Sequence, residues 1–157
     1  MRSPVAALGS RRDTGRAMSE ESTPPDSVEG THQLHRLLNS RDLDAVTELF
    51  APGSIWDASR WGLGSHEAPS SLRQFLRDWI GSFDVYELTL EEIQDVGNGI
   101  VFAVFFHAAD LQGGGGSLRV RSSAVLDWEA GQLVGLTSYR DVDKARAAAE
   151  RLAEERA

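Results

Sequence analysis

The spacing of hydrophobic residues in the first half of the chain follows the period of a helix in three separate segments. Apolar residues three and four positions apart predict helices over about 28–39, 43–50 and 70–80. The segment SIWDAS, at 54–59, predicts a short strand. The loop RWGLGSHEAPSS, with two glycines and one proline, separates this strand from the third helix.

The period changes to two after Phe83, which predicts a run of strands. The expected strands cover 85–96, 100–110, 118–128 and 133–141. Asn98-Gly99 is a strong hairpin signal between the first two, and the nearly continuous apolar run IVFAVFFHAAD predicts a strand buried on both faces. An Ala-rich helix, expected on the surface or at the sheet edge, closes the chain. Helices followed by an antiparallel meander indicate the α+β class, with the long strands curling around the third helix.

Composition narrows the classes of partner. The 157 residues suffice for one domain, and the net charge of −8 with a pI near 4.9 disfavours binding to nucleic acid or to an anionic membrane. No apolar run approaches the length of a transmembrane helix. The chain has no cysteine, and its four histidines lack metal-binding spacing, so we expect neither a metal nor a cofactor. The absence of cysteine does not indicate a compartment, and the cytoplasmic location that we expect follows from the character of the N-terminus.

The first 25 residues have a different character. They are polar, contain prolines and show no periodicity, which predicts a disordered segment. The only apolar piece, PVAAL, is too short for a secretory signal, and Met18 opens an ordinary-looking N-terminus. We therefore expect residues 1–17 to be an upstream extension or a flexible arm, and the folded domain to cover 26–157.

The order and lengths of these elements resemble the NTF2-like superfamily, the group of nuclear transport factor 2, the SnoaL-like proteins and ketosteroid isomerase. The resemblance covers about 28–150 and lies in NSRDLDAVTELFAPGSIWD, SSLRQFLRDWIGSF, EEIQDVGNGIVFAVF, VLDWEAGQLVGLTSYRD and KARAAA. It implies a cone, formed by a strongly curved antiparallel sheet around the N-terminal helices. It also implies an apolar pocket at the open end and a homodimer through the outer sheet face.

Aromatic side chains are the candidate lining of such a pocket, which would accept a small apolar or aromatic ligand. The candidates are Trp56, Trp61, Phe75, Trp79, Phe83, Tyr86, Phe106, Trp128 and Tyr139. Each of them is also compatible with a place in the core. Trp61 is the candidate least easily explained as a core residue, because it lies in a Gly-flanked loop. Arg121 is a further candidate, as a clamp for a ligand carboxylate, unless it lies on the outer face.

Asp57 and His107 are the candidate catalytic pair. The resemblance implies a general base on the first strand, and RDLD…SIWD puts Asp57 at the matching place. A carboxylate in an apolar cone has a raised pKa and can move a proton between carbons of a bound ketone. His107 could complete an acid–base pair of the SnoaL-like kind. The alternatives are a hydrogen-bonded Asp at a strand end and a structural His at the sheet rim.

The catalytic sets of two relatives are incomplete in this sequence. Leu34 and Ser123 or Ala124 stand where a ketosteroid isomerase-like oxyanion hole would need its Tyr and Asp. The Arg-x-Asp pair and further Asp of limonene epoxide hydrolase are also missing. Two hypotheses therefore stay open: a cofactor-free isomerase, cyclase or hydrolase, and a non-catalytic ligand-binding or interaction module.

Overall fold

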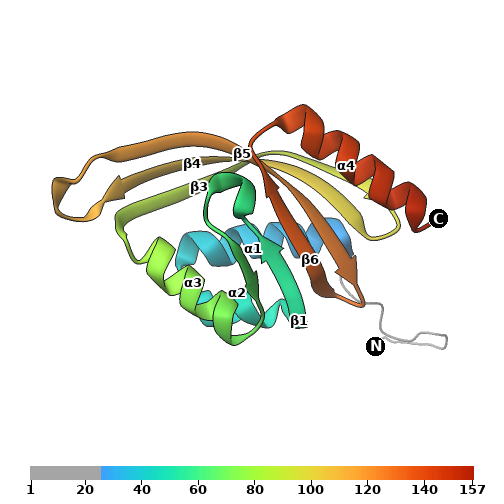
Figure 1. The fold of residues 1–157 in the computed structure, drawn as a ribbon, viewed down its shortest axis with the longest axis horizontal. Helices are drawn as coiled ribbons and strands as arrows, with labels where there is room; N and C mark the ends of the chain where they lie inside the picture. The colour runs from blue at the N-terminus through green and yellow to red at the C-terminus, as the bar shows by residue number, and fades with distance from the viewer. Residues whose placement is uncertain (1–25) are drawn as a thin grey trace, which may run out of the picture.

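A curved six-stranded sheet organises the computed structural model, which describes residues 26–157 (Figure 1). The prediction of disorder for residues 1–25 lies outside the described residues. The helices are α1 (Ser27–Ser40), α2 (Leu43–Glu48), α3 (Ser70–Ile80) and α4 (Val142–Glu155), with the 3-10 turns η1 (Ser59–Trp61) and η2 (Gln112–Gly114). The strands are β1 (Phe50–Asp57), β2 (Ser65–Glu67), β3 (Phe83–Gly97), β4 (Ile100–Leu111), β5 (Ser117–Glu129) and β6 (Gln132–Tyr139).

The strands lie in the order β2-β1-β6-β5-β4-β3. Pairing is antiparallel throughout except between β1 and β6, which run parallel, so the sheet is mixed rather than wholly antiparallel as predicted. The parallel pair arises because β1 comes before the meander in sequence and joins it beside its last strand. The short strand β2 was not predicted and pairs with β1 through Trp56 and His66.

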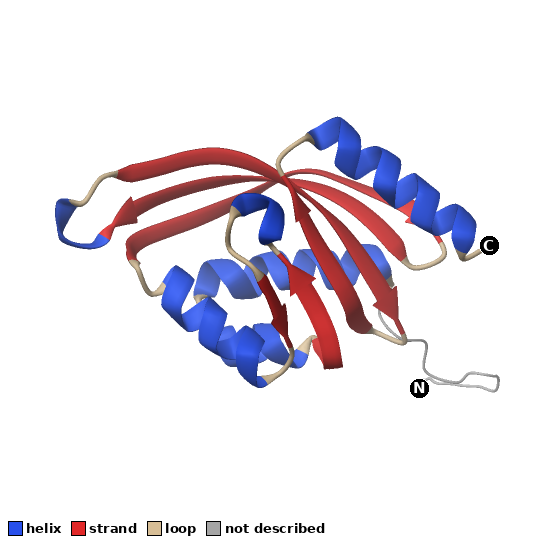
Figure 2. Cartoon of the chain, viewed as in Figure 1, coloured by secondary structure: helices blue, strands red, loops and turns tan. Residues whose placement is uncertain are grey.

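Helices cover both faces of the sheet (Figures 1 and 2). α1, α2 and α3 lie on the concave face, and α4 crosses the opposite face over β4 and β5. Ala145, Ala149 and Ala153 of α4 pack against Phe102 and other apolar residues of β4 and β5. This second core explains why the first half of β4 is apolar on both faces, as predicted. It also corrects the expectation that α4 is an edge element, since its alanine stripe allows close packing on the face.

One end of the concave side is filled by a tryptophan. Trp128 is buried against α1, where a Cβ on Gly30 would lie only 2.8 Å from its ring. Its indole N–H donates to the Thr31 hydroxyl at 3.2 Å, and Thr31 donates in turn to the Ser27 carbonyl. Trp128 is therefore a core residue at the closed end of the cone, not a lining residue of a pocket, because glycine at position 30 leaves room for its ring.

The free edge of β3 is engaged by a side chain from α1. Asn39 donates to the Leu88 carbonyl at 2.8 Å and accepts from the Leu88 N–H at 2.7 Å. The ring nitrogen Nε2 of His35 lies 2.6 Å from the same carbonyl. The amide of Asn39 thus takes the place of a neighbouring strand at the middle of β3 and fixes α1 against the sheet.

Every helix within residues 26–157 is too short or too polar to cross a membrane.

Candidate functional site

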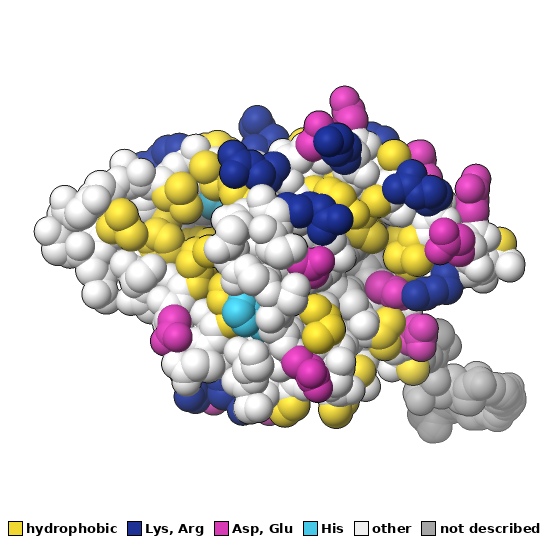
Figure 3. All heavy atoms as spheres, in the orientation of Figure 1, with side chains coloured by type: hydrophobic (Ala, Val, Ile, Leu, Met, Phe, Trp, Pro, Cys, Tyr) yellow, Lys and Arg dark blue, Asp and Glu magenta, His cyan; other side chains and the backbone are white. Residues whose placement is uncertain are grey.

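A cavity of about 220 Å³ opens between the concave face of the sheet, α1, α3 and the η1 loop. Its wall is overwhelmingly apolar, and hydrophobic side chains gather on the surface between α3 and the strands β4 and β5 (Figure 3). The aromatic lining residues are Trp56, Trp61, Phe75, Trp79, Tyr86 and Phe105. Engineered apolar cavities of about 150 Å³ take up benzene, so this space suits one ring or two fused rings.

Strand alternation decides which residues reach the cavity. Every second residue of a strand points to the same face. β4 contributes Phe105 and His107, and β5 contributes Leu118, Val120, Ser122 and Ala124. Leu136 and Ser138 of β6 continue the wall. Of these strand residues, only His107 was predicted to line the site. Strict alternation along β4 from His107 indicates Phe105. The same alternation, carried across to the paired strands, indicates Ser122 and Ser138.

Three polar side chains form a chain of contacts inside this apolar wall. The Tyr86 hydroxyl lies 3.0 Å from Nδ1 of His107, and Nε2 of His107 lies 2.7 Å from the Ser122 hydroxyl. The three residues come from adjacent strands, β3, β4 and β5. His107 also contacts Trp79 edge-on, with ring centroids 6.1 Å apart, which holds the imidazole in place.

Burial sets the protonation states of this chain. Desolvation lowers the pKa of His107 to about 4, so its imidazole is neutral at pH 7. Desolvation also raises the pKa of Tyr86 well above its ordinary value, so the phenol keeps its proton. A neutral imidazole donates from one nitrogen and accepts at the other. The chain can therefore run in either direction, and its free end offers one hydrogen-bond donor to the cavity: the Ser122 hydroxyl in one arrangement and the Tyr86 hydroxyl in the other.

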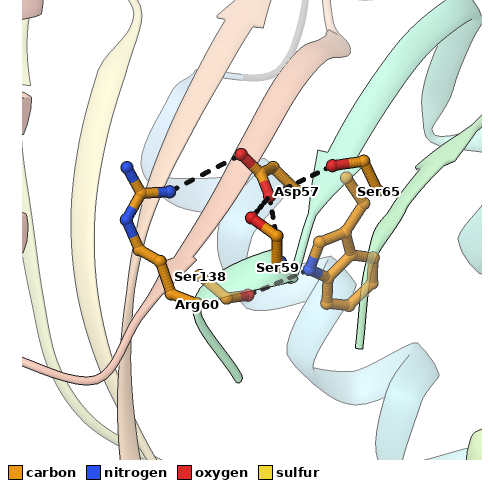
Figure 4. A network of polar contacts seen from close by, with 6 residues as sticks. Asp57, Ser59, Arg60, Ser65 and Ser138 are labelled. Carbon is orange, nitrogen blue, oxygen red and sulfur yellow. Dashed lines mark hydrogen bonds and ion pairs between the residues drawn. The ribbon is translucent and has the colours of Figure 1, made fainter. Parts of the chain in front are cut away.

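Asp57 lies outside the cavity, so the expectation that it shares a pocket with His107 is wrong. Trp56 points to the cavity, and its strand neighbour Asp57 consequently faces the other side. The Asp57 carboxylate accepts from the Ser59 N–H at 3.0 Å, the Ser59 hydroxyl at 2.6 Å and the Ser65 hydroxyl at 3.1 Å (Figure 4). Arg60 lies 3.5 Å away. These hydrogen bonds, first of all those from Ser59, lower the pKa of Asp57, opposite to what a general base in an apolar cone requires.

Three further predicted ligand contacts also lie away from the cavity. Phe106 and Arg121 are neighbours on the convex face, where the guanidinium of Arg121 lies 5.7 Å from the Phe106 ring centroid and pairs with Glu91. Tyr139 faces the same side and packs on the core under α4. The guanidinium of Arg60 lies over its ring, 4.4 Å from the centroid. All three precede or follow a cavity-lining residue by one position, so alternation places them on the outer face.

The predicted aromatic residues that do meet at the cavity form a connected set. Phe75 stacks on Trp79 with ring centroids 6.2 Å apart and meets Trp56 edge-on at the same distance. The Trp56 indole N–H donates to the Ser138 hydroxyl at 3.0 Å, a contact that Figure 4 draws below those of Asp57. Phe83, which was also predicted to line the pocket, packs against Trp79 and Tyr86 and does not line the cavity. Residues 26–157 hold no cluster of three or more side chains suited to a metal ion.

Comparison with known proteins agrees with this architecture. The family model of the SnoaL-like domain matches residues 31–136. The chain belongs to the SnoaL-like family. The search of curated protein sequences found no match to this SnoaL-like chain.

Solved structures show the same fold at low identity. An NTF2-like protein of unknown function from Burkholderia pseudomallei superposes with a TM-score of 0.64 at 17% identity, over 80% of this SnoaL-like chain and 98% of that one. TerC, co-crystallised with polyporic acid, gives 0.62 at 13% identity over 80% and 98%. The epoxide hydrolase/cyclase-like enzyme SalBIII, which has a role in pyran ring formation in the polyether salinomycin, gives 0.64 at 13% identity over 73% and 90%. These similarities confirm the predicted NTF2-like α+β fold.

Proposed function

We propose that this SnoaL-like protein binds a small apolar ring compound in the cavity and holds one polar group of that compound at the Tyr86–His107–Ser122 chain. The observation that carries the proposal is this hydrogen-bonded chain in a wall that is apolar apart from it and Ser138. Ligand sites combine apolar walls with a few placed polar groups in this way. TerC, which has the same fold and was co-crystallised with polyporic acid, supports a ring-shaped ligand.

Binding can be tested with a matched pair of probes. We expect 2-naphthol and 2-methylnaphthalene, which have similar shapes and differ in one hydroxyl, both to raise the melting temperature by linkage to the folded state. 2-Naphthol should bind more tightly, and Ser122→Ala, which removes one of the two end hydroxyls of the chain, should reduce this preference. Ser123→Ala is the control, because Ser123 follows in the strand but faces the other side and makes only a 3.4 Å contact with the Tyr139 carbonyl. Absence of any shift with either probe would contradict the proposal.

The same chain can support cofactor-free acid–base chemistry of the isomerase or cyclase type. Starting with Ser122 donating to Nε2, the Ser122 oxygen accepts a proton from an acidic carbon of the ligand as its own proton passes to His107. Nδ1 then delivers its proton to Tyr86, and Tyr86 protonates the ligand carbonyl oxygen. The ketone becomes an enol, and the chain ends neutral with its direction reversed. SalBIII, an enzyme with this fold, supports a catalytic reading of the site.

A non-catalytic binding role is the second candidate, and one observation favours it: no carboxylate is among the residues lining the cavity in the described part of the chain. The two roles are separated by incubating 2-tetralone in D₂O and following deuterium at its α-carbon by NMR. Catalysis predicts exchange faster than in buffer, abolished by His107→Gln. Binding alone predicts a melting shift with no faster exchange.

The outer face of the sheet is the proposed dimer interface. α4 covers one part of this face, while the other part carries the half-buried Phe106 under Arg121 and the exposed Val85. We expect a dimer by light scattering after size exclusion and a monomer for Phe106→Glu. A monomeric wild type would contradict this assignment. The cytoplasmic location inferred from the sequence remains a prediction.

A further inference from the structure

A groove between α4, the end of β6 and the η1 turn is lined mainly by cationic side chains. It has a volume of about 550 Å³, and within residues 26–157 it shares no lining residue with the apolar cavity. Lys and Arg side chains gather on this side of the molecule, over α4 and beside the η1 turn (Figure 3). One carboxylate, Asp141, lines the groove together with four cations: Arg60, Arg140, Lys144 and Arg151. Positive charge is therefore concentrated here, although the chain as a whole has a net charge of −8.

The helix α4 builds one wall of the groove from a cationic face. Lys144 and Arg151 are separated by about two helical turns, so both project from the same side of α4. Between them, Ala147 and Ala148 line the groove and leave it open because their side chains are small. The opposite side of the helix packs on the sheet through three buried residues, Ala145, Ala149 and Ala153. This packing fixes the cationic face of α4 toward the groove.

Three of the four cations have no partner of opposite charge in the described part of the chain. Arginines elsewhere on the surface pair with carboxylates, as in Arg36–Glu29, Arg73–Asp44, Arg121–Glu91 and Arg146–Glu92. Arg41 and Arg119 donate to main-chain carbonyls instead. Within residues 26–157, the side chains of Arg140, Lys144 and Arg151 make neither an ion pair nor a hydrogen bond, and all three line the groove. Because like charges repel, an anion that binds among them would relieve this repulsion.

Aromatic rings hold two of the guanidinium groups in place. The guanidinium of Arg140 lies over the Trp61 ring, 4.8 Å from its centroid, and that of Arg60 lies over the Tyr139 ring at 4.4 Å. A ring orients a guanidinium without cancelling its charge. Arg60 also lies 3.5 Å from the Asp57 carboxylate, so it offers less free charge than Arg140 (Figure 4).

The carboxylate in the groove is already engaged by the helix. Asp141 is the N-cap of α4 and accepts from the Lys144 N–H at 3.0 Å. Its negative charge therefore compensates the start of the helix. The positive potential of the groove consequently comes from its side chains and not from the N-terminus of α4.

We propose that this groove binds a small soluble anion that carries a phosphate or pyrophosphate group. Guanidinium groups bind phosphate through paired hydrogen bonds, and several cations together favour an anion with more than one negative charge. A long polyanion or an anionic membrane is disfavoured, because acidic residues such as Asp143 and Glu150 lie on the same helix and the whole chain is acidic. This second binding site is independent of the proposed ligand cavity.

The single lysine of the chain provides a direct test. Because Lys144 is the only lysine, protein labelled with [¹⁵N]lysine should give one backbone amide signal, and that amide belongs to a residue of the groove. Sodium pyrophosphate and sodium acetate are titrated separately at pH 7 and constant ionic strength. We expect the signal to shift and saturate with pyrophosphate at a concentration at least about tenfold lower than with acetate, since the more highly charged anion meets several cations.

Two arginine variants keep this signal and test the groove itself. Arg140→Gln and Arg151→Gln should each weaken pyrophosphate binding about threefold to tenfold. Arg151→Gln is the cleaner of the two, because Arg140 also covers Trp61. Arg119→Gln is the matched control: Arg119 is an exposed arginine of β5 that does not line the groove, so its loss should change binding less than about twofold. All three side chains are exposed, and the melting temperature of each variant checks that it folds.

The outcomes are decided without reference to the cavity. A saturable shift with pyrophosphate, weakened by Arg151→Gln and kept in Arg119→Gln, supports the inference. A shift that does not saturate, equal responses to the two anions, or equal weakening by Arg151→Gln and Arg119→Gln would overturn it. The melting shift with 2-naphthol reports on the cavity alone, so either proposal can fail while the other stands.

Discussion

Each end of the concave side has a tryptophan, but one fills its end of the sheet and the other borders a cavity. At the closed end, Trp128 fills the space beside Gly30 and donates to Thr31, so the ring is packed and its N–H is paired. At the open end, Trp61 stands beside a cavity of about 220 Å³ and its N–H has no partner. Helix α1 gives Trp128 both room and an acceptor, and the indole of Trp61 has no acceptor within residues 26–157. Where α1 presents Leu34 and Leu38 instead, a hollow remains.

The largest test of this contrast is Trp128→Ala. Removing a fully packed tryptophan should lower the free energy of unfolding by about 3–5 kcal/mol, because a void opens and the ring contacts are lost. Trp61→Ala should cost far less, since that ring already borders a hollow. Denaturant unfolding of both variants measures the difference. Equal losses would show that the two ends are packed alike.

The next largest effect is a pH dependence at the open end. The folded state keeps His107 neutral down to about pH 4, whereas an unfolded histidine binds a proton near pH 6.5. The unfolded state therefore binds more protons between these values, and stability falls as the pH drops from about 6.5 to 4. The difference in pKa corresponds to about 3 kcal/mol. His107→Gln should remove this part of the slope in unfolding experiments at pH 7, 5.5 and 4.5. An unchanged slope would contradict the assignment.

A smaller effect is expected at the loop of Trp61. Asp57→Ala should lower the free energy of unfolding by about 1 kcal/mol, comparable to losing a helix cap, because the N–H of Ser59 loses its acceptor. Since the pKa of Asp57 is lowered by folding, its contribution is complete above the unfolded pKa near 4 and disappears as the pH falls through the folded value. Asp44→Ala is the control: Asp44 pairs with Arg73 and Arg77 at the surface and should change stability by less than about 0.5 kcal/mol. A larger loss for Asp44→Ala than for Asp57→Ala would contradict this view of the loop.

The smallest effect is the most diagnostic. Trp61→Phe should leave the stability of the protein without added ligand unchanged or raise it by about 0.5 kcal/mol, because the variant loses an N–H that the fold does not satisfy. Thermal and denaturant unfolding against wild type measure this. A clear loss of stability would mean that the indole serves the fold, as Trp128 does.

The sequence predicted the fold well because each element has its own local signal. The leucine spacing of α1, the helical period of α3 and the Asn98-Gly99 hairpin all depend on neighbours in the chain, and the structure confirms them. The parallel partner of β1 and the packing of α4 on the outer face depend on contacts between distant segments. No local pattern specifies those contacts.

The site was predicted in part for the same reason. Adjacent strand residues such as Trp56 and Asp57, or Phe106 and His107, cannot face one cavity, and strict use of alternation would have separated them. Predicting the contact between His107 and Ser122 requires the register of β4 against β5, and no local pattern in the sequence specifies that register. The unpaired N–H of Trp61 depends on the position of every nearby hydroxyl, so only coordinates could reveal it.

The hydrogen bonds of Asn39 to the edge strand β3 limit the ways in which copies of this protein can associate. A bare outermost strand invites another chain to extend the sheet, which is a common start of fibre growth. Here the midpoint of that strand is already taken by Asn39, and the opposite rim is a strand of three residues. Strand addition is thereby hindered on both sides, which favours face-to-face contact as the route to self-assembly. Asn39→Ala would expose the rim and should make the protein prone to aggregate during refolding.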